Sequence, residues 1–330
     1  MPLWPPGFAR IPDEEWTRAP VASLAQKYDA VGRHGWYANL DESVAELARE
    51  LAPGQVLVDY SGGTGLLIER LLRVLGERDV GIVNVDSSPK FLALALEKLR
   101  HEPRVAFRLI RYLKEEKRLQ TLDEALEAPM LARGVDALVS ANAIHLYYGL
   151  DETLASWARV LRPGGLVHVQ SGNIRASGAP KDEWIIDDTV AAVDRAAREI
   201  VRSEPRHARH RAALDDPVRM AAHDAFREKV FLPPRPLAHY TEALERAGLR
   251  VEKVWTRGIE ARADEWHQFL AAYSDAVLGW VGGTEKVEGR PPAAEDLEAR
   301  LALMREGLAR VLEGRDAFRA TWTYIRARRA

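Results

Sequence analysis

The chain has 330 residues, of which 47% are hydrophobic and 29% are charged, and its 47 basic and 49 acidic residues leave a net charge of −2. These values are typical of a soluble globular protein and give no general reason to expect nucleic acid or an anionic membrane as a partner. No apolar run in the sequence approaches the roughly 18 residues that a membrane span needs. There is no cysteine, which excludes disulfides, thiolate catalysis and cysteine metal sites, and because the N-terminus lacks the pattern of a secretory signal we expect a cytoplasmic protein.

The N-terminal segment is rich in aromatic residues. Trp4, Phe8 and Trp16 lie among prolines, which predicts an irregular arm that packs its rings onto a domain. Three more aromatic residues precede the first long helix: Tyr28, Trp36 and Tyr37. That helix is expected over about residues 41–51, where apolar side chains recur at helical spacing.

The stretch at residues 56–68 reads V-L-V-D-Y-S-G-G-T-G-L-L-I. It predicts a buried strand that ends in an acid, then a glycine-rich loop, then the N-terminus of a helix. Glycine has no Cβ and accepts positive φ, so such a loop lets the backbone approach a nucleotide closely.

Strands and helices alternate after this loop. Further strands are expected over residues 80–85, 105–110, 135–140 and 166–170, with helices between them. Strands that alternate with helices at this spacing form a parallel sheet covered on both faces.

The polar residues of the loop distinguish two kinds of nucleotide. A dinucleotide fold needs G-x-G-x-x-G and an acid about 20 residues later; Asp86 meets the second requirement, but Ile68 stands at the third glycine position. Asp59, inside the motif, would repel a pyrophosphate and suits a cationic amine. The sequence therefore favours a small zwitterionic nucleoside over NAD.

Four motifs in order resemble the class I S-adenosylmethionine-dependent methyltransferases over about residues 41–172. V-L-V-D-Y-S-G-G-T-G resembles the first motif of that family, and V-N-V-D-S-S-P-K-F-L the motif at the second strand. V-D-A-L-V-S-A-N-A-I-H-L and V-L-R-P-G-G-L-V-H-V resemble the motifs of the fourth and fifth strands. The resemblance implies an α/β fold with a Rossmann-like seven-stranded sheet and an antiparallel last strand, which residues 318–325 would supply beside a sixth strand at 249–255.

The resemblance also implies S-adenosylmethionine as the cofactor, with no metal. Its site would be formed by Asp59, Ser61, Gly63, Gly65, Asp86, Ser87, Tyr112 and Asn142. Of these, the two glycines would lie under the methionine portion and Asp59 would contact its amino group. Asp86 would accept hydrogen bonds from both ribose hydroxyls, Ser87 would lie beside the adenine, and Asn142 near the sulfonium or its carboxypropyl arm.

The chain departs from the family pattern at two positions. Ser61 stands where the first family glycine is usual, so the turn must tolerate a side chain there. Arg111 stands where an acid often contacts the adenine amine, and that contact falls to Tyr112, to the backbone or to no group.

His145 is the candidate catalytic residue, because it follows the fourth strand and imidazole titrates near neutral pH. The alternative is a structural histidine packed against Tyr147 or Tyr148. In-line positioning of two reactants contributes on the order of 7–11 kcal/mol, so methyl transfer can proceed without a dedicated base.

The rest of the chain is expected to recognise the acceptor. We predict an N-terminal arm or lid over residues 1–40, a helical insert over 173–236, and the end of the core over 237–330 with a helical insertion at about 260–316. Long insertions on a fixed scaffold carry specificity, and their apolar stripes predict a lidded pocket for a small, partly apolar molecule rather than nucleic acid or a membrane. Two other functions stay open: a non-catalytic S-adenosylmethionine-binding regulator or scaffold, and a nucleotide-dependent oxidoreductase.

Overall fold

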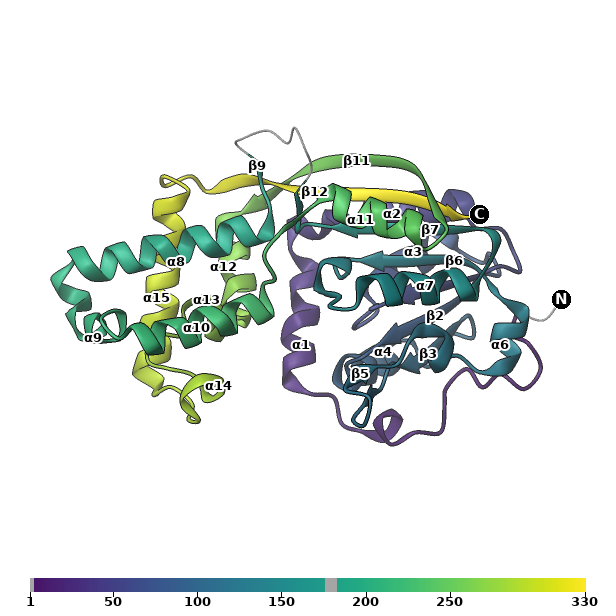
Figure 1. Ribbon diagram of the computed structural model, residues 1–330, viewed down its shortest axis with the longest axis horizontal. Helices are drawn as coiled ribbons and strands as arrows, with labels where there is room; N and C mark the ends of the chain where they lie inside the picture. Colours follow the sequence, from purple (N-terminus) through teal and green to yellow (C-terminus); the bar gives the residue numbers. More distant parts are fainter. Residues whose placement is uncertain (1–2, 176–182) are drawn as a thin grey trace.

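A computed structural model describes residues 3–175 and 183–330. Its centre is a mixed sheet with the strand order β11-β12-β7-β6-β1-β2-β3, and the short strand β9 (Glu183–Trp184) pairs with the outer part of β12. The Rossmann-like sheet with an antiparallel last strand is thus confirmed (Figure 1).

The strands lie close to where the sequence places them. They are β1 (Val56–Tyr60), β2 (Gly81–Asp86), β3 (Val105–Leu109), β6 (Val135–Ala141), β7 (Leu161–Ser171), β11 (Leu249–Arg262) and β12 (Ala317–Arg329). The first five are parallel, and β12 runs antiparallel to both β7 and β11. Two short ladders lie outside this sheet: β4 (Tyr112–Leu113) with β5 (Arg118–Leu119), and β8 (Ile174–Arg175) with β10 (Arg235–Pro236).

Helices cover both faces of the sheet. One face carries α2 (Asn39–Glu50), α3 (Leu66–Leu75) and α4 (Pro89–Leu99). The other carries α5 (Leu122–Ala125), α6 (Ala128–Arg133), α7 (Leu150–Val160) and α11 (Leu237–Arg246). Because neighbouring strand residues point to opposite faces, Leu57 packs with the first group and Val56 and Val58 with the second.

A helical lobe stands beside the sheet and is built from two separate segments (Figure 1). The first gives α8 (Ile186–Ser203), η5 (Pro205–His210), α9 (Arg211–Leu214) and α10 (Pro217–Val230). The second gives α12 (Ala263–Ala272), α13 (Ser274–Leu278), α14 (Glu285–Glu288) and α15 (Ala294–Val311). The segments share one apolar core, in which Val193 of α8 packs with Leu303 and Leu308 of α15. Trp266 reinforces the junction by donating its indole N–H to Thr189 at 3.0 Å.

The N-terminal segment joins the core to this lobe. It contains η1 (Glu15–Arg18), α1 (Ser23–Ala30), η2 (Val31–Arg33) and η3 (Gly35–Ala38). The backbone N–H of Gly35 donates to Glu265 of α12 at 2.9 Å, and Trp36 packs edge-on against Trp266 and Phe269. Across residues 3–175 and 183–330, no helix combines the length and the apolar character that crossing a membrane requires.

Candidate active site

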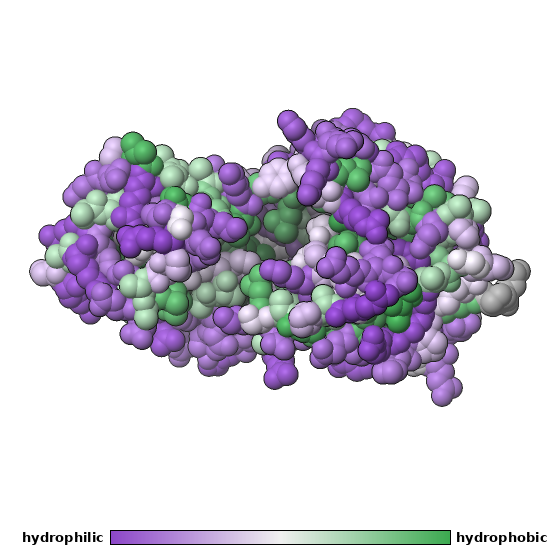
Figure 2. All heavy atoms as spheres, turned by 90° about the horizontal axis from the view of Figure 1, so that it is seen from below, coloured by the Kyte–Doolittle hydropathy of each residue, from purple (hydrophilic) through white to green (hydrophobic). Residues whose placement is uncertain are grey.

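A cavity of about 720 Å³ opens at the carboxyl ends of the central strands. Its walls come from three parts of the molecule: the strand ends, the N-terminal segment and the helical lobe. Figure 2 shows this hollow between the core and the lobe, with hydrophobic residues inside it. Of the predicted site residues, those that line the cavity are Ser61, Gly63, Asp86, Ser87, Tyr112, Asn142 and His145.

The glycine-rich loop is held in a tight turn over β2. The backbone N–H groups of Ser61 and Gly62 both donate to the carbonyl of Val85, at 2.7 and 3.1 Å. A Cβ on Gly62 would lie 2.3 Å from Asn84 Oδ1, so no side chain fits there. Ser61 adopts φ +64°, a left-handed conformation that glycine reaches without strain, which explains why the family has glycine at this position. Gly65, with φ +82°, is the N-cap of α3.

Asp59 lies beneath the loop, facing a small pocket that adjoins the main cavity. Its side chain is 1% exposed, and neither carboxylate oxygen has a hydrogen-bond partner among the described residues. Burial, and then the charge of Asp86, raises the pKa of Asp59 to about 8. A buried carboxyl group without donors is costly for the free protein, so this one fits a ligand that supplies a cationic amine.

Asp86 is already oriented by the backbone. Its two carboxylate oxygens accept the N–H groups of Gly63 at 2.9 Å and Ser88 at 2.7 Å. Burial raises its pKa to about 6, although the backbone N–H groups of Ser88, Gly63 and Ser87 act in the opposite direction. The carboxylate therefore has a fixed position at the edge of the cavity, with lone pairs left for hydroxyl donors.

Asn142 is held by a buried polar network. Its Oδ1 accepts the indole N–H of Trp322 at 2.7 Å and an amide N–H of Gln170 at 3.4 Å, and its Nδ2 donates to Asn39 Oδ1 at 3.1 Å. The residue adopts φ +57°, an unusual conformation for a side chain that is not glycine. This pattern fixes the orientation of the amide and leaves one N–H of Nδ2 for a ligand.

His145 makes a different contact from those that the sequence suggests. Its Nδ1 is 2.8 Å from Ser171 Oγ, which also accepts the backbone N–H of Asn173 at 3.0 Å. Burial lowers the pKa of His145 to about 4, so the ring is neutral near pH 7. Tyr147 instead bonds with Ser61 at 3.0 Å and with Ser140 at 2.8 Å.

Tyr112 and Arg111 lie differently with respect to the cavity. Tyr112 lines it and is 57% exposed, whereas Arg111 does not line it and forms an ion pair with Glu14 at 2.9 Å. Sequence reasoning missed two residues that line the cavity. Phe91 stacks on Tyr28, and Tyr147 forms a hydrogen bond with Ser61. The only signal in the sequence was position: Phe91 lies inside the motif of the second strand, and Tyr147 directly follows that of the fourth.

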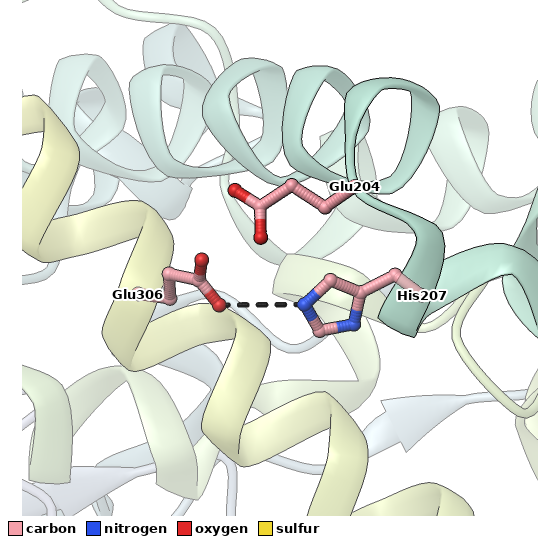
Figure 3. A group of neighbouring side chains, drawn as sticks. All are labelled: Glu204, His207 and Glu306. Atoms are coloured by element: carbon pink, nitrogen blue, oxygen red, sulfur yellow. Dashed lines mark ion pairs between the residues drawn. The ribbon is translucent and has the colours of Figure 1, made fainter.

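A second cluster of polar groups lies far along the lobe. Glu204, His207 and Glu306 place one potential metal-ligand atom each within 4.8 Å of one another (Figure 3). Arg206 contacts both carboxylates, and Arg310 lies 3.1 Å from Glu204. Two guanidinium groups thus already balance the acids, and we assign the cluster as an ion-pair network that joins η5 to α15.

Comparisons with known proteins bear on this site. A family model described as "Methyltransferase domain" matches residues 58–167. Among curated proteins, the hybrid PKS-NRPS synthetase lepA of Aspergillus flavus is 30% identical over 116 residues, which are 34% of this chain and 3% of that protein. The chain thus spans only a small part of the curated relative that it matches.

Solved structures are similar in fold. The YcgJ protein from Bacillus subtilis is 11% identical with a TM-score of 0.50, over 89% of this chain and 98% of that chain. The Haemonchus contortus phosphoethanolamine N-methyltransferase 2, in complex with S-adenosylhomocysteine, is 13% identical with a TM-score of 0.48, over 92% of this chain and 56% of that chain. The family match shows a methyltransferase domain from β1 to β7, and the sheet with its antiparallel last strand agrees with that match. S-Adenosylmethionine is the cofactor of such domains.

Proposed function

We propose that the protein transfers a methyl group from S-adenosylmethionine to a small-molecule acceptor, and that both molecules bind in the cavity between the core and the helical lobe. The observation that carries this proposal is the buried carboxyl group of Asp59, whose oxygens lack donors below a glycine-rich loop. A cationic amine placed there would satisfy that group, and the amino group of S-adenosylmethionine has this charge.

The remaining residues fit the other parts of the same molecule. Asp86 would accept the ribose hydroxyls, because its carboxylate is oriented and has free lone pairs. The loop backbone at Gly63 and Gly65 would lie along the methionine portion, and the free N–H of Asn142 would donate to its carboxylate. The two residues assigned to the adenine are Ser87 and Tyr112, which line the same cavity.

The chain's contribution to the reaction would be mainly positioning. S-Adenosylmethionine supplies a methyl carbon activated by a sulfonium; the acceptor's lone pair forms the new bond while the sulfur keeps the electrons of the old one. The rings of Tyr28, Trp36 and Tyr37 line the cavity and can stabilise a cation through their faces. Walls that enclose both reactants exclude water and restrict their relative orientation.

We propose that His145 holds the acceptor and does not act as a strong base. Ser171 Oγ accepts the backbone N–H of Asn173, and its single hydroxyl hydrogen is free to be donated. We assign this hydrogen to the bond with His145, so that Ser171 donates and Nδ1 accepts. The neutral ring then carries its hydrogen on Nε2 and can donate it to an acceptor oxygen or nitrogen. The acceptor's own proton would leave to solvent once the methylated product leaves the cavity.

We further propose that the acceptor is not a nucleic acid and that the protein acts in the cytoplasm. The net charge of −2 supplies no broad basic surface for a phosphate backbone, and a chain without cysteine forms no disulfide and so needs no oxidising compartment to fold.

Calorimetry with S-adenosylmethionine, S-adenosylhomocysteine and NAD tests the proposal. We expect the two sulfur nucleosides to bind. Asp86→Ala should weaken the binding of S-adenosylhomocysteine by about 1–3 kcal/mol, because it removes charge-assisted hydrogen bonds. Asp264→Ala is the control, since Asp264 is an exposed residue whose ion-pair partner is Arg262. Binding of NAD without binding of the sulfur nucleosides would contradict the proposal. A screen of acceptors for S-adenosylhomocysteine formation then tests the transfer itself.

A further inference from the structure

We propose that the acceptor is an uncharged molecule with a flat apolar ring system, held between the N-terminal segment and the helical lobe. This inference rests on the proposed methyl transfer, because it assigns the half of the cavity that the cofactor would leave free. It concerns residues outside the methyltransferase match at 58–167.

The walls of this half are aromatic and aliphatic. The lobe contributes Ile186, Val230, Phe231, Phe269 and Tyr273, and the N-terminal segment contributes Val31 and Trp36. Tyr28 and Tyr37 also line the small pocket that Asp59 faces, so they lie at the boundary with the cofactor half. The rings contact one another edge to face: Phe231 and Tyr273 have centroids 5.7 Å apart, Phe269 and Tyr273 5.5 Å, and Trp36 and Phe269 5.4 Å. Such a continuous aromatic wall favours a flat apolar ligand.

Charged side chains are confined to the other half. Among the described residues, the charged side chains that line the cavity are Asp86, Lys117, Arg118 and Glu152. None of them belongs to the lobe or the N-terminal segment, and Arg118 is already paired with Glu116 and Glu124. A charged acceptor would therefore be desolvated without a counter-ion, which is costly. A cationic acceptor would also be repelled by the sulfonium in a poorly solvated space.

Two phenol hydroxyls can hold a polar group of the acceptor. Tyr37 donates to Tyr28 at 3.3 Å, which leaves the hydrogen of the Tyr28 hydroxyl for a ligand. Tyr273 lies at the same wall. Burial raises the pKa of Tyr273, and the neighbouring Tyr37 together with burial raises the pKa of Tyr28. Both therefore stay neutral donors, which suits a hydroxyl or carbonyl oxygen on the acceptor.

Competition among three molecules with the same ring tests the charge of the acceptor. The fluorescent probe is N-phenyl-1-naphthylamine, added to protein saturated with S-adenosylhomocysteine. We expect 1-naphthol to displace it at a concentration at least tenfold lower than either 1-naphthoate or 1-naphthylmethylammonium. Equal or better competition by a charged naphthalene, or no binding of the probe, would overturn the proposal.

Variants locate the binding. Phe231→Ala should lower the affinity for the probe at least tenfold and change the affinity for S-adenosylhomocysteine by no more than about twofold. Phe231→Leu is a milder replacement if the alanine variant does not fold. Val218→Ala is the control, because Val218 lies on α10, the helix that ends just before Phe231, and is 79% exposed. Probe binding that Phe231 does not affect would overturn the assignment. Failure of S-adenosylhomocysteine to bind would instead refute the proposed function, and probe binding is scored separately from it.

Discussion

At the scale of single residues, Asp59 shows how a binding site can oppose the stability of the fold. Its carboxyl group is buried and has no hydrogen-bond donor among the described residues. Burial and the nearby Asp86 raise its pKa to about 8, whereas the unfolded chain has an ordinary carboxyl group. The free protein thus pays an electrostatic cost near neutral pH that a cationic ligand would remove.

This cost predicts how Asp59→Asn behaves as the pH changes. Below about pH 4 the carboxyl group is protonated in both states, so the variant and the parent should have similar melting temperatures. As the pH rises toward 8, the unfolded parent ionises and the folded parent does not, which lowers its free energy of unfolding by at most about 1.4 kcal/mol per pKa unit. Asparagine does not ionise, so the ligand-free variant should melt several degrees higher than the parent at pH 8.

Ligand binding gives the companion measurement. A cationic amine beside Asp59 would lower the pKa of Asp59, so binding of S-adenosylhomocysteine at pH 7 should release close to one proton per molecule. Calorimetry in two buffers of different ionisation enthalpy measures this number, and Asp59→Asn should bring it near zero while weakening the affinity. Identical melting curves for the two proteins from pH 4 to 8 would show that Asp59 is not the strained group.

The residues of the loop also show what a sequence can and cannot predict. The acid and the glycines follow from their local pattern, since strand, turn and helix each have recognisable residue preferences. The left-handed conformations of Ser61 and Asn142 do not, because neither residue type requires them. They depend on contacts with Tyr147 and Trp322, which are distant in sequence.

At the scale of elements, residues 34–37 and helix α12 form one contact unit. His34 lies 3.2 Å from Gln268, the Gly35 N–H donates to Glu265, and Trp36 packs on Phe269. These bonds link a segment before the sheet to an insertion between its last two strands. A wall of the cavity therefore depends on the link.

Glu265→Ala should loosen this link without unfolding the protein. The exposed carboxylate makes one bond to the Gly35 backbone, so we expect a loss of only about 0.5–1.5 kcal/mol. Hydrogen exchange should become faster in residues 23–38 and stay unchanged in β1 and β6. Asp264→Ala, on the same turn of α12, is the control, and equal exchange in the two variants would argue against the link.

The sequence predicted the strands of the sheet, because buried parallel strands read as short apolar runs. It placed the ends of two strands too early: β11 extends to Arg262 and β12 extends to Arg329. The added residues, such as Glu260 and Arg262, are charged, and only pairing between the two strands makes them extended. The choice of Phe231 and Tyr273 as cavity walls was equally out of reach, since it depends on how two insertions pack together.

At the scale of the whole molecule, the cavity spans the core, the lobe and the N-terminal segment. Buried residues of all three parts belong to one apolar core, so a ligand bound to any of them should stabilise them together. At a hundred times its dissociation constant, S-adenosylhomocysteine should add about 2.7 kcal/mol to the free energy of unfolding and raise the melting temperature of a single calorimetric transition. A transition that splits, with one part unmoved by the ligand, would mean that the lobe unfolds independently of the core.

The position of β12 has a consequence for biosynthesis. In the described sheet β11 pairs with β12, and β12 lies between β11 and β7, although it is the last of these strands to leave the ribosome. At roughly 5–20 residues per second, the 54 residues between the end of β11 and the start of β12 take a few seconds to synthesise. During that interval β11 exposes an unpaired edge and β7 lacks its neighbour. The nascent chain is therefore most open to misassembly while the second half of the helical lobe is being made.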